Sequence, residues 1–258
     1  DLTLHNVAKY TTQGMTSMIM QDDFPAVVWT SSTDNPAADS SVFFWRCSSA
    51  TVGGQLACDD SINNWCNAAG TCGAATYDQL FTTGTNSIVL AADIAQVPSG
   101  ASTQAKALYV YFSQAAGTAL KRVTASCSNC AASPPTWTWG GVITVDSSTV
   151  SGSREDDINA RADSTNNRII FMWGSTSTTD CGAATTYCLL TQYRDFSTAS
   201  ASNSTVKMVG LASTTEASVP TEGEVNYISA HKRYYVVTAN SSNNITWYSM
   251  PDTWTNWS

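Results

Sequence analysis

The chain reads Arg168-Ile-Ile-Phe-Met-Trp173 and then, after a turn, Cys188-Leu-Leu-Thr-Gln-Tyr193, two apolar runs of strand type. Such runs are rich in β-branched and aromatic residues and are bounded by Gly, Asn, Asp and Ser, which is the pattern of strands joined by turns. A pair of this kind occurs four times, and recurrence at a long period indicates one supersecondary unit copied along the chain. The other three pairs are 26–29 with 41–45, 108–112 with 120–123, and 234–237 with 245–248.

We expect a further strand ahead of each pair and a short fourth strand behind some of them. No window has the i, i+3, i+4 and i+7 apolar spacing of a helix, so helices should be few. Divided over four units, the 258 residues allow about 65 residues each, which suits four-stranded blades. The sequence therefore predicts a single all-β domain over residues 1–258, a β-propeller with about four blades; the alternative is a β-sandwich, or two in tandem. The expected first strands are 15–20, 87–92, 157–162 and 224–229, and the expected fourth strands include 135–139 and 252–257.

Two segments fit the repeat less well. Residues 1–10 alternate like a strand, and we expect this strand either to close the ring or to pair with a neighbouring subunit. Residues 53–84 contain several turn signals and three cysteines, and we interpret them as a stapled insertion in the first blade or a degenerate fifth blade.

The eight cysteines lie in local groups. Zinc would favour paired Cys-x-x-Cys units or nearby histidines, but one such unit occurs and the two histidines, His5 and His231, are distant in sequence. We therefore predict disulfides and no metal site, with a structural calcium ion in an acidic turn as the sole expected exception. Pairing between sequence neighbours is the simplest connectivity: Cys47–Cys58, Cys66–Cys72, Cys127–Cys130 and Cys181–Cys188.

Composition restricts the partners. The net charge is −8 and charged residues make up 12% of the chain, so neither nucleic acid nor an anionic membrane surface is an expected partner. No apolar run approaches the roughly 20 residues of a membrane span. The chain begins at Asp1 and reads as a processed, secreted form, and four sequons agree with export. The predicted N-glycosylation sites are Asn203, Asn240, Asn244 and Asn256.

The segment from Ile245 to Trp257 resembles the third strand, Asp-containing turn and fourth strand of a sialidase-like (Asp-box) propeller blade. Residues 178–182, Thr-Thr-Asp-Cys-Gly, resemble the same turn. The resemblance implies a propeller in which Asp252 and Asp180 hold turns through backbone N–H groups. Ser249 lacks the expected spacing to Asp252, and none of the seven arginines matches the catalytic set of that family. We therefore predict no catalytic residues and no cofactor.

Glycoside hydrolysis needs two carboxylates on facing elements. Four acidic residues lie near first-strand positions and so near the expected axis; we interpret them as solvated turn carboxylates or calcium ligands. They are Asp23, Asp93, Asp157 and Glu224.

Aromatic side chains are the remaining candidates for ligand binding. Indole rings stack on the C–H faces of sugars, and four tryptophans lie near turns, so we predict that they bind glycan; the alternative is that they pack blade against blade. They are Trp137, Trp139, Trp254 and Trp257. The predicted function is a secreted, non-catalytic glycan-binding or adhesive protein, with carbohydrate or copies of itself as partner. The first alternative is a structural subunit of an extracellular filament or coat assembled by strand addition, and the second is a glycoside hydrolase.

Overall fold

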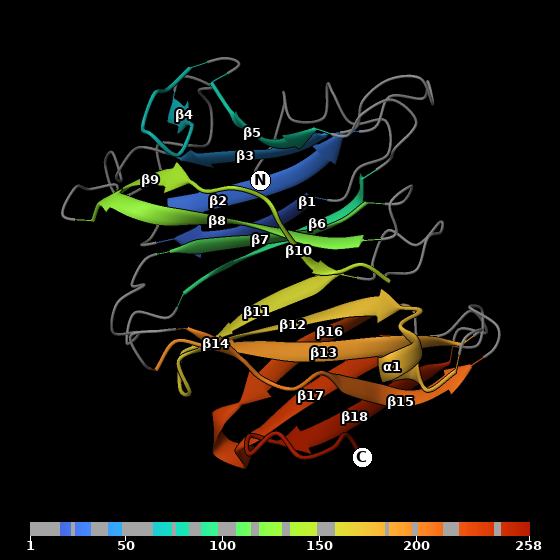
Figure 1. Ribbon diagram of the computed structural model, residues 1–258. Helices are drawn as coiled ribbons and strands as arrows, with labels where there is room; N and C mark the ends of the chain where they lie inside the picture. The colour runs from blue at the N-terminus through green and yellow to red at the C-terminus, as the bar shows by residue number, and fades with distance from the viewer. Residues whose placement is uncertain are drawn as a thin grey trace.

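A computed structural model describes most of the chain, and its strands dominate (Figure 1). Two helical elements within the described ranges are short: the one-turn helix α1 (Thr178–Cys181) and the 3-10 turn η4 (Ser229–His231). The prediction of an all-β chain is confirmed. The described residues are 16–21, 24–31, 41–47, 64–73, 76–82, 89–97, 107–114, 119–130, 135–148, 158–183, 186–197, 201–213, 222–239 and 244–258.

The described strands form four antiparallel sheets in chain order. Sheet 1 contains β1 (Thr16–Gln21), β2 (Phe24–Ser31), β3 (Ser41–Cys47), β4 (Trp65–Cys66) and β5 (Asp78–Thr82). Sheet 2 contains β6 (Val89–Gln96), β7 (Leu108–Gln114), β8 (Ala119–Asn129), β9 (Thr136–Trp139) and β10 (Ile143–Asp146). Sheet 3 contains β11 (Asn159–Asp163), β12 (Arg168–Ser175), β13 (Tyr187–Asp195), β14 (Ser202–Asn203) and β15 (Lys207–Ser213). Sheet 4 contains β16 (Glu222–Ile228), β17 (Arg233–Ala239) and β18 (Ile245–Pro251).

The first three sheets share one plan. A meander of three strands is followed by two short strands that both pair with the third strand: β4 and β5 with β3, β9 and β10 with β8, β14 and β15 with β13. In sheet 4 the backbones of Ser249 and Ser258 exchange hydrogen bonds of 3.0 and 2.9 Å, so the chain after β18 begins the same outer pairing. The repeat expected from the sequence is therefore present in the strand order.

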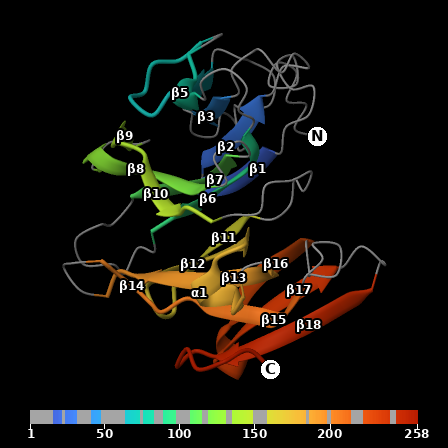
Figure 2. The ribbon, with the colours of Figure 1, turned by 45° about the vertical axis from the view of Figure 1, so that its right-hand side comes forward.

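The sheets pack face to face in chain order, as Figures 1 and 2 show. The central strands β7 and β12 are buried along most of their length because each has a neighbouring sheet on both faces. Between sheets 2 and 3, for example, the rings of Tyr111 and Phe171 stack with their centroids 4.4 Å apart. The first strands also meet in sequence, β1 with β6, β6 with β11 and β11 with β16. This order agrees with the predicted blades, and the propeller itself, including closure of a ring, remains a prediction.

Two sequence interpretations need correction. The segment 53–84 is not a fifth blade in its described part, because β4 and β5 complete the outer edge of sheet 1. Residues 252 and 253 form a turn and residues 254–257 have no regular secondary structure, so the predicted strand 252–257 is wrong; Trp254 has a left-handed backbone, with φ +59°. The predicted strand 1–10 lies outside the described residues. No helix in the described ranges is long and apolar enough to cross a membrane.

Candidate functional site

Two of the four tryptophans predicted to bind glycan are buried, one between sheets 1 and 2 and the other between sheets 3 and 4. Trp137 on β9 is 2% exposed, and the guanidinium of Arg46 from β3 lies over its ring at 4.8 Å. Trp254 is 7% exposed, and its ring packs edge-on against Tyr193 and Tyr234. Neither ring has an open face, so this placement favours the packing alternative.

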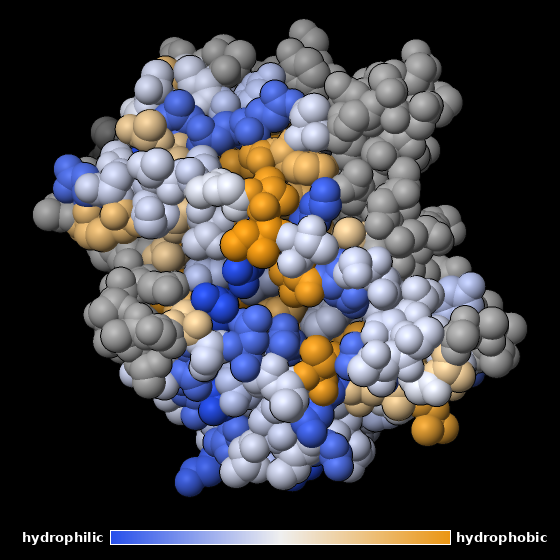
Figure 3. Space-filling model, in the orientation of Figure 1, coloured by the Kyte–Doolittle hydropathy of each residue, from blue (hydrophilic) through white to orange (hydrophobic). Residues whose placement is uncertain are grey.

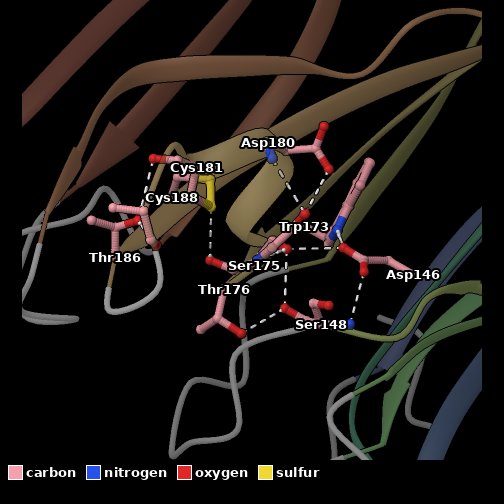
Figure 4. Close-up of a disulfide and its surroundings, with 11 residues drawn as sticks. Asp146, Ser148, Trp173, Ser175, Thr176, Asp180, Cys181, Thr186 and Cys188 are labelled. Atoms are coloured by element: carbon pink, nitrogen blue, oxygen red, sulfur yellow. Dashed lines mark hydrogen bonds between the residues drawn. A yellow bond between two sulfur atoms is a disulfide. The ribbon is translucent and has the colours of Figure 1, made fainter.

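The other two tryptophans are partly exposed and use their indole N–H within the fold. Trp139 donates to Oδ2 of Asp78, 3.0 Å away in sheet 1, and Trp257 donates to Oγ1 of Thr191 at 2.9 Å. A similar bond links the next two sheets, where Trp173 on β12 donates to Oδ2 of Asp146 at 2.7 Å (Figure 4). Trp139 and Trp173 thus have the same role: each donates a hydrogen bond that links its own sheet to an aspartate of the preceding sheet.

Two of the four first-strand carboxylates, Asp93 and Glu224, meet at one arginine. Arg161 on β11 places Nη1 2.9 Å from Oδ2 of Asp93 and Nη2 3.4 Å from Oε1 of Glu224. Ser17 on β1 donates to Asp93, and Asn159 accepts the backbone N–H of Val225 at 3.0 Å. These bonds connect the first strands of all four sheets, so we name Ser17, Asp93, Asn159, Arg161 and Glu224 the axial network. Asp23 and Asp157 lie outside the described residues.

The environment of Asp93 is that of a structural carboxylate. It is 4% exposed and accepts the backbone N–H groups of Ile94 and Ala160, each at 2.8 Å. Burial raises the pKa of Asp93 above its usual value, although Arg161 and the donated hydrogen bonds oppose the rise. Because its lone pairs face protein donors, Asp93 is poorly placed to exchange a proton with a substrate.

A second polar and aromatic cluster lies at the junction of sheets 3 and 4, at the end where the β11–β12 and β16–β17 turns meet. Its members are all partly exposed, and we name them the junction cluster: Asn166, Arg168, Tyr193, Asp195, Tyr227 and Asp252. Arg168 is its centre. The guanidinium lies 4.1 Å from the centroid of the Tyr193 ring, and its nitrogens donate to the carbonyl oxygen of Asp252 at 2.9 Å and to Oδ2 of Asp195 at 3.5 Å.

The other members of the junction cluster are hydrogen-bonded to one another or to buried groups beneath them. Tyr227 donates its hydroxyl to Oδ2 of Asp252 at 3.1 Å, and burial with this bond raises the pKa of Tyr227. Asn166 donates to Oδ2 of Asp163 at 2.8 Å, and the same oxygen accepts the buried hydroxyl of Tyr234 at 2.7 Å. The side chains at the surface are therefore fixed in place before any ligand arrives.

Asp195 keeps its charge in this cluster. Burial acts to raise the pKa of Asp195, but two hydrogen bonds from Ser197 and the nearby Arg168 hold it below the usual value. The cluster thus presents an ionised carboxylate, an amide, an arginine and two tyrosine rings on one small surface.

Sequence reasoning missed the junction cluster. Arg168 and Tyr193 lie within strands that the sequence identifies, but the partners of Arg168 are 27 residues away at Asp195 on β13 and 84 residues away at Asp252 in a turn. The resemblance to Asp-containing turns implies that Asp252 and Asp180 lie in turns. Asp252 does, and its backbone N–H donates to the carbonyl of Lys232 at 3.0 Å. Asp180 lies in α1, whose N-cap is Ser177: the Ser177 hydroxyl accepts the backbone N–H of Asp180 and donates to its Oδ2 at 2.8 Å.

The predicted disulfides Cys66–Cys72, Cys127–Cys130 and Cys181–Cys188 are present. Cys47 is also disulfide-bonded, and its predicted partner Cys58 lies outside the described residues. Figure 4 shows Cys181–Cys188 closing the α1 loop onto β13, beside the Asp146 carboxylate and its bonds to Trp173 and Ser175.

Three of the four predicted N-glycosylation sites lie within the described residues. Asn203, Asn244 and Asn256 are exposed, and Asn240 lies outside the described residues. Within the described ranges, no group of three or more His, Cys, Asp or Glu side chains is arranged to hold a metal ion.

No protein-family profile and no curated protein matches the chain. Among solved structures, a triple mutant of AofleA from Arthrobotrys oligospora is similar, with a TM-score of 0.52 and 9% identity over 98% of this chain and 58% of that chain. A mutant of the Aleuria aurantia lectin in complex with Fucalpha1-6GlcNAc has a TM-score of 0.49 at 14% identity, over 95% of this chain and 60% of that chain. An alpha-L-arabinofuranosidase from Lactobacillus brevis has a TM-score of 0.45 at 12% identity, over 95% of this chain and 76% of that chain. The chain spans about three fifths of the length of the first two structures, and at 9% identity the likeness to AofleA is one of fold.

Proposed function

We propose that the chain is a non-catalytic glycan-binding protein and that the junction cluster is its sugar site. The observation that carries the proposal is the arrangement around Arg168: a tyrosine face, two carboxylates and an amide, partly exposed and already hydrogen-bonded to one another. Sites with a few fixed polar groups beside aromatic rings bind small polar ligands with little loss of side-chain entropy.

The chemistry of the cluster matches a sugar. Each sugar hydroxyl donates one hydrogen bond and accepts others, so it pairs with Asp252 or Asp195 as acceptor and with Asn166 as donor or acceptor. The partly exposed ring of Tyr227 offers an apolar face to the C–H groups of the pyranose. The likeness in fold to AofleA is compatible with this proposal but does not identify a ligand.

The absence of catalysis is part of the proposal. A glycosidase needs one carboxyl group that is protonated at the working pH, and its pKa must therefore be raised. In the junction cluster Asp195 has a lowered pKa. Among the described residues, the carboxyl group whose pKa is raised is that of Asp93, which is buried among protein donors.

Glycan-array binding followed by titration calorimetry tests the proposal, with Fucalpha1-6GlcNAc among the probes. We expect a dissociation constant of about 0.1 to 1 mM per site, because a shallow sugar contact leaves little surplus over the cost of association. Tyr227→Ala and Asn166→Ala should each weaken binding by about tenfold or more.

Asn244→Ala is the matched control, because this exposed asparagine precedes β18 at the opposite end of the strand from Asp252. Binding that is equally weakened by the control, or that survives Tyr227→Ala, would refute the site. Turnover of a panel of glycosides by purified protein would refute the non-catalytic function.

We also infer that the protein works outside the cytosol. The disulfides Cys66–Cys72, Cys127–Cys130 and Cys181–Cys188 support this, because such bonds persist in oxidising compartments. Intact-mass measurement of protein from its natural host, before and after removal of N-glycans, tests the sequons at the same time. Assembly of a filament or coat through residues 1–10 concerns a segment outside the described residues and stays a prediction.

A further inference from the structure

Two arginines lie beside one tyrosine at the junction of sheets 2 and 3. Arg122 is on β8 and Arg194 on β13, and their guanidinium carbons lie 5.2 and 5.9 Å from the centroid of the Tyr109 ring. Arg194 also donates to the hydroxyl of Tyr109 at 3.3 Å and to Oδ1 of Asn203 at 2.9 Å. Figure 3 shows strongly hydrophilic side chains gathered near β14, where the two sheets meet. We name this group the two-arginine cluster: Tyr109, Tyr111, Arg122 and Arg194.

Neither arginine of this cluster forms an ion pair with a described residue. Asp195 follows Arg194 in the sequence, but it points to the other face of β13 and pairs with Arg168 at 3.5 Å. Asp146 on β10, the strand beside β8, accepts the indole N–H of Trp173 at 2.7 Å. The carboxylates on these strands are therefore engaged elsewhere, and the positive charge of the cluster is left uncompensated by them.

Two polar atoms of the cluster are buried and unsatisfied. Arg122 is 8% exposed, and its Nε has no hydrogen-bond partner among the described residues. The hydroxyl of Tyr111, which lies opposite Arg122 in the β7–β8 register, is buried and equally without a partner there. An unpaired buried charge and an unsatisfied buried donor both lower stability, so an acceptor bound between them would relieve a cost that the fold already bears.

We propose that the two-arginine cluster is a second ligand site and that it binds the carboxylate group of an acidic sugar. A guanidinium presents its N–H donors in a planar fork that matches a carboxylate, and such charge-assisted hydrogen bonds are stronger than neutral ones. Arg194 is partly exposed and Asn203 is exposed, so the cluster is open to solvent on the side of β13 and β14. Because the chain has a net charge of −8, binding of an anion requires a local concentration of positive charge, which the two arginines supply.

The sugar part of this proposal rests on the proposed function, whereas the carboxylate part does not. Successive residues of a strand point to opposite faces, so β13 presents Tyr193 and Asp195 of the junction cluster to sheet 4 and Arg194 to sheet 2. The two sites therefore use different side chains. They also differ in charge, because the junction cluster has two carboxylates and one arginine, whereas the two-arginine cluster has no carboxylate among its members.

Titration calorimetry with glucuronic acid, glucose and acetate at one ionic strength tests the proposal, because glucose lacks the carboxylate and acetate lacks the sugar. Glucuronate should bind with a dissociation constant of about 0.1 to 1 mM, about tenfold or more tighter than glucose or acetate. Arg122→Met and Arg194→Met should each weaken glucuronate binding by about tenfold or more. Arg194→Met is the decisive variant, since its partly exposed side chain can be replaced with an unchanged circular dichroism spectrum. Tyr227→Ala, which alters the junction cluster alone, should leave glucuronate binding intact.

Arg233→Met is the matched control, because it removes the same charge from a partly exposed arginine on β17 that donates to Ser249. The control should bind glucuronate as the wild type does. Three results would overturn the site: glucuronate that binds no more tightly than glucose, binding that Arg194→Met retains, or an equal loss in Arg233→Met. Loss of glucuronate binding in Tyr227→Ala would assign it to the junction cluster and overturn a second site. Acetate that binds as tightly as glucuronate would support the carboxylate site and overturn the acidic sugar as its ligand.

Discussion

The Asp93 carboxylate on β6 lies 2.9 Å from Nη1 of Arg161 on β11, 68 residues away in the chain. Through Ser17 and Glu224 the same network reaches β1 and β16. A buried carboxylate with one partly exposed arginine as its ionic partner makes the centre of this fold sensitive to protonation.

Stability should fall as pH rises through the folded-state pKa of Asp93. That pKa is raised above 3.8, so the folded chain binds the proton more tightly than the unfolded chain does, and the free energy of unfolding decreases between the two values. The contribution of one titrating group to the free energy of unfolding changes by at most about 1.4 kcal/mol per pH unit. Urea unfolding at a series of pH values measures this slope.

Asp93→Asn removes the titrating group and is the comparison for that series. The difference in unfolding free energy between wild type and variant should depend on pH above 3.8. Asp195, with its lowered pKa, gives the opposite slope at lower pH in both proteins and cancels from the difference. A constant difference from pH 4 to pH 8 would contradict the assignment.

Gly210→Ala should destabilise the junction of sheets 3 and 4 by about 1 to 3 kcal/mol. Gly210 has φ +69°, and a Cβ there would lie 2.8 Å from Oη of Tyr248 on β18. Gly141→Ala is the control, because nothing lies within 4 Å of its Cβ position. Equal midpoints of thermal unfolding for the two variants would show that the Tyr248 side chain moves away from the added Cβ without lowering the stability, and would contradict this prediction.

Trp254→Ala should lower the free energy of unfolding by about 3 to 5 kcal/mol. The indole is buried against Tyr193 and Tyr234 and donates to the carbonyl of Thr205 at 2.8 Å. Thr255→Ala, at the exposed next residue, should stay within about 0.5 kcal/mol. Loss of glycan binding by Trp254→Ala with unchanged stability would revive the sugar-binding role that the sequence predicts.

Removing the Cys181–Cys188 disulfide with a double alanine variant should cost about 2 to 3 kcal/mol on the chain-entropy model. The two cysteines are seven positions apart and both are buried. Alanine is chosen because serine at these buried positions would introduce a hydroxyl without a hydrogen-bond partner. Chemical denaturation with and without the bond measures the cost. An unchanged midpoint would mean that the α1 loop is held by other contacts, such as the Ser177 cap.

The sequence by itself determined the features that depend on near neighbours. The paired runs at 168–173 and 188–193 became β12 and β13 because β-branched and aromatic residues bounded by turn residues favour strands at any place in a fold. The disulfides whose partners are separated by three to seven positions in the sequence followed from chain proximity.

Only the tertiary structure decided which side chains meet across sheets. Trp137 and Trp247 each follow a threonine within a strand, yet one is 2% and the other 64% exposed, because exposure depends on whether another sheet covers that face. Asp93 and Arg161 likewise meet because two first strands pack side by side. Local composition selects a strand, whereas the partner of each face is selected by contacts between distant segments, which residue spacing does not encode.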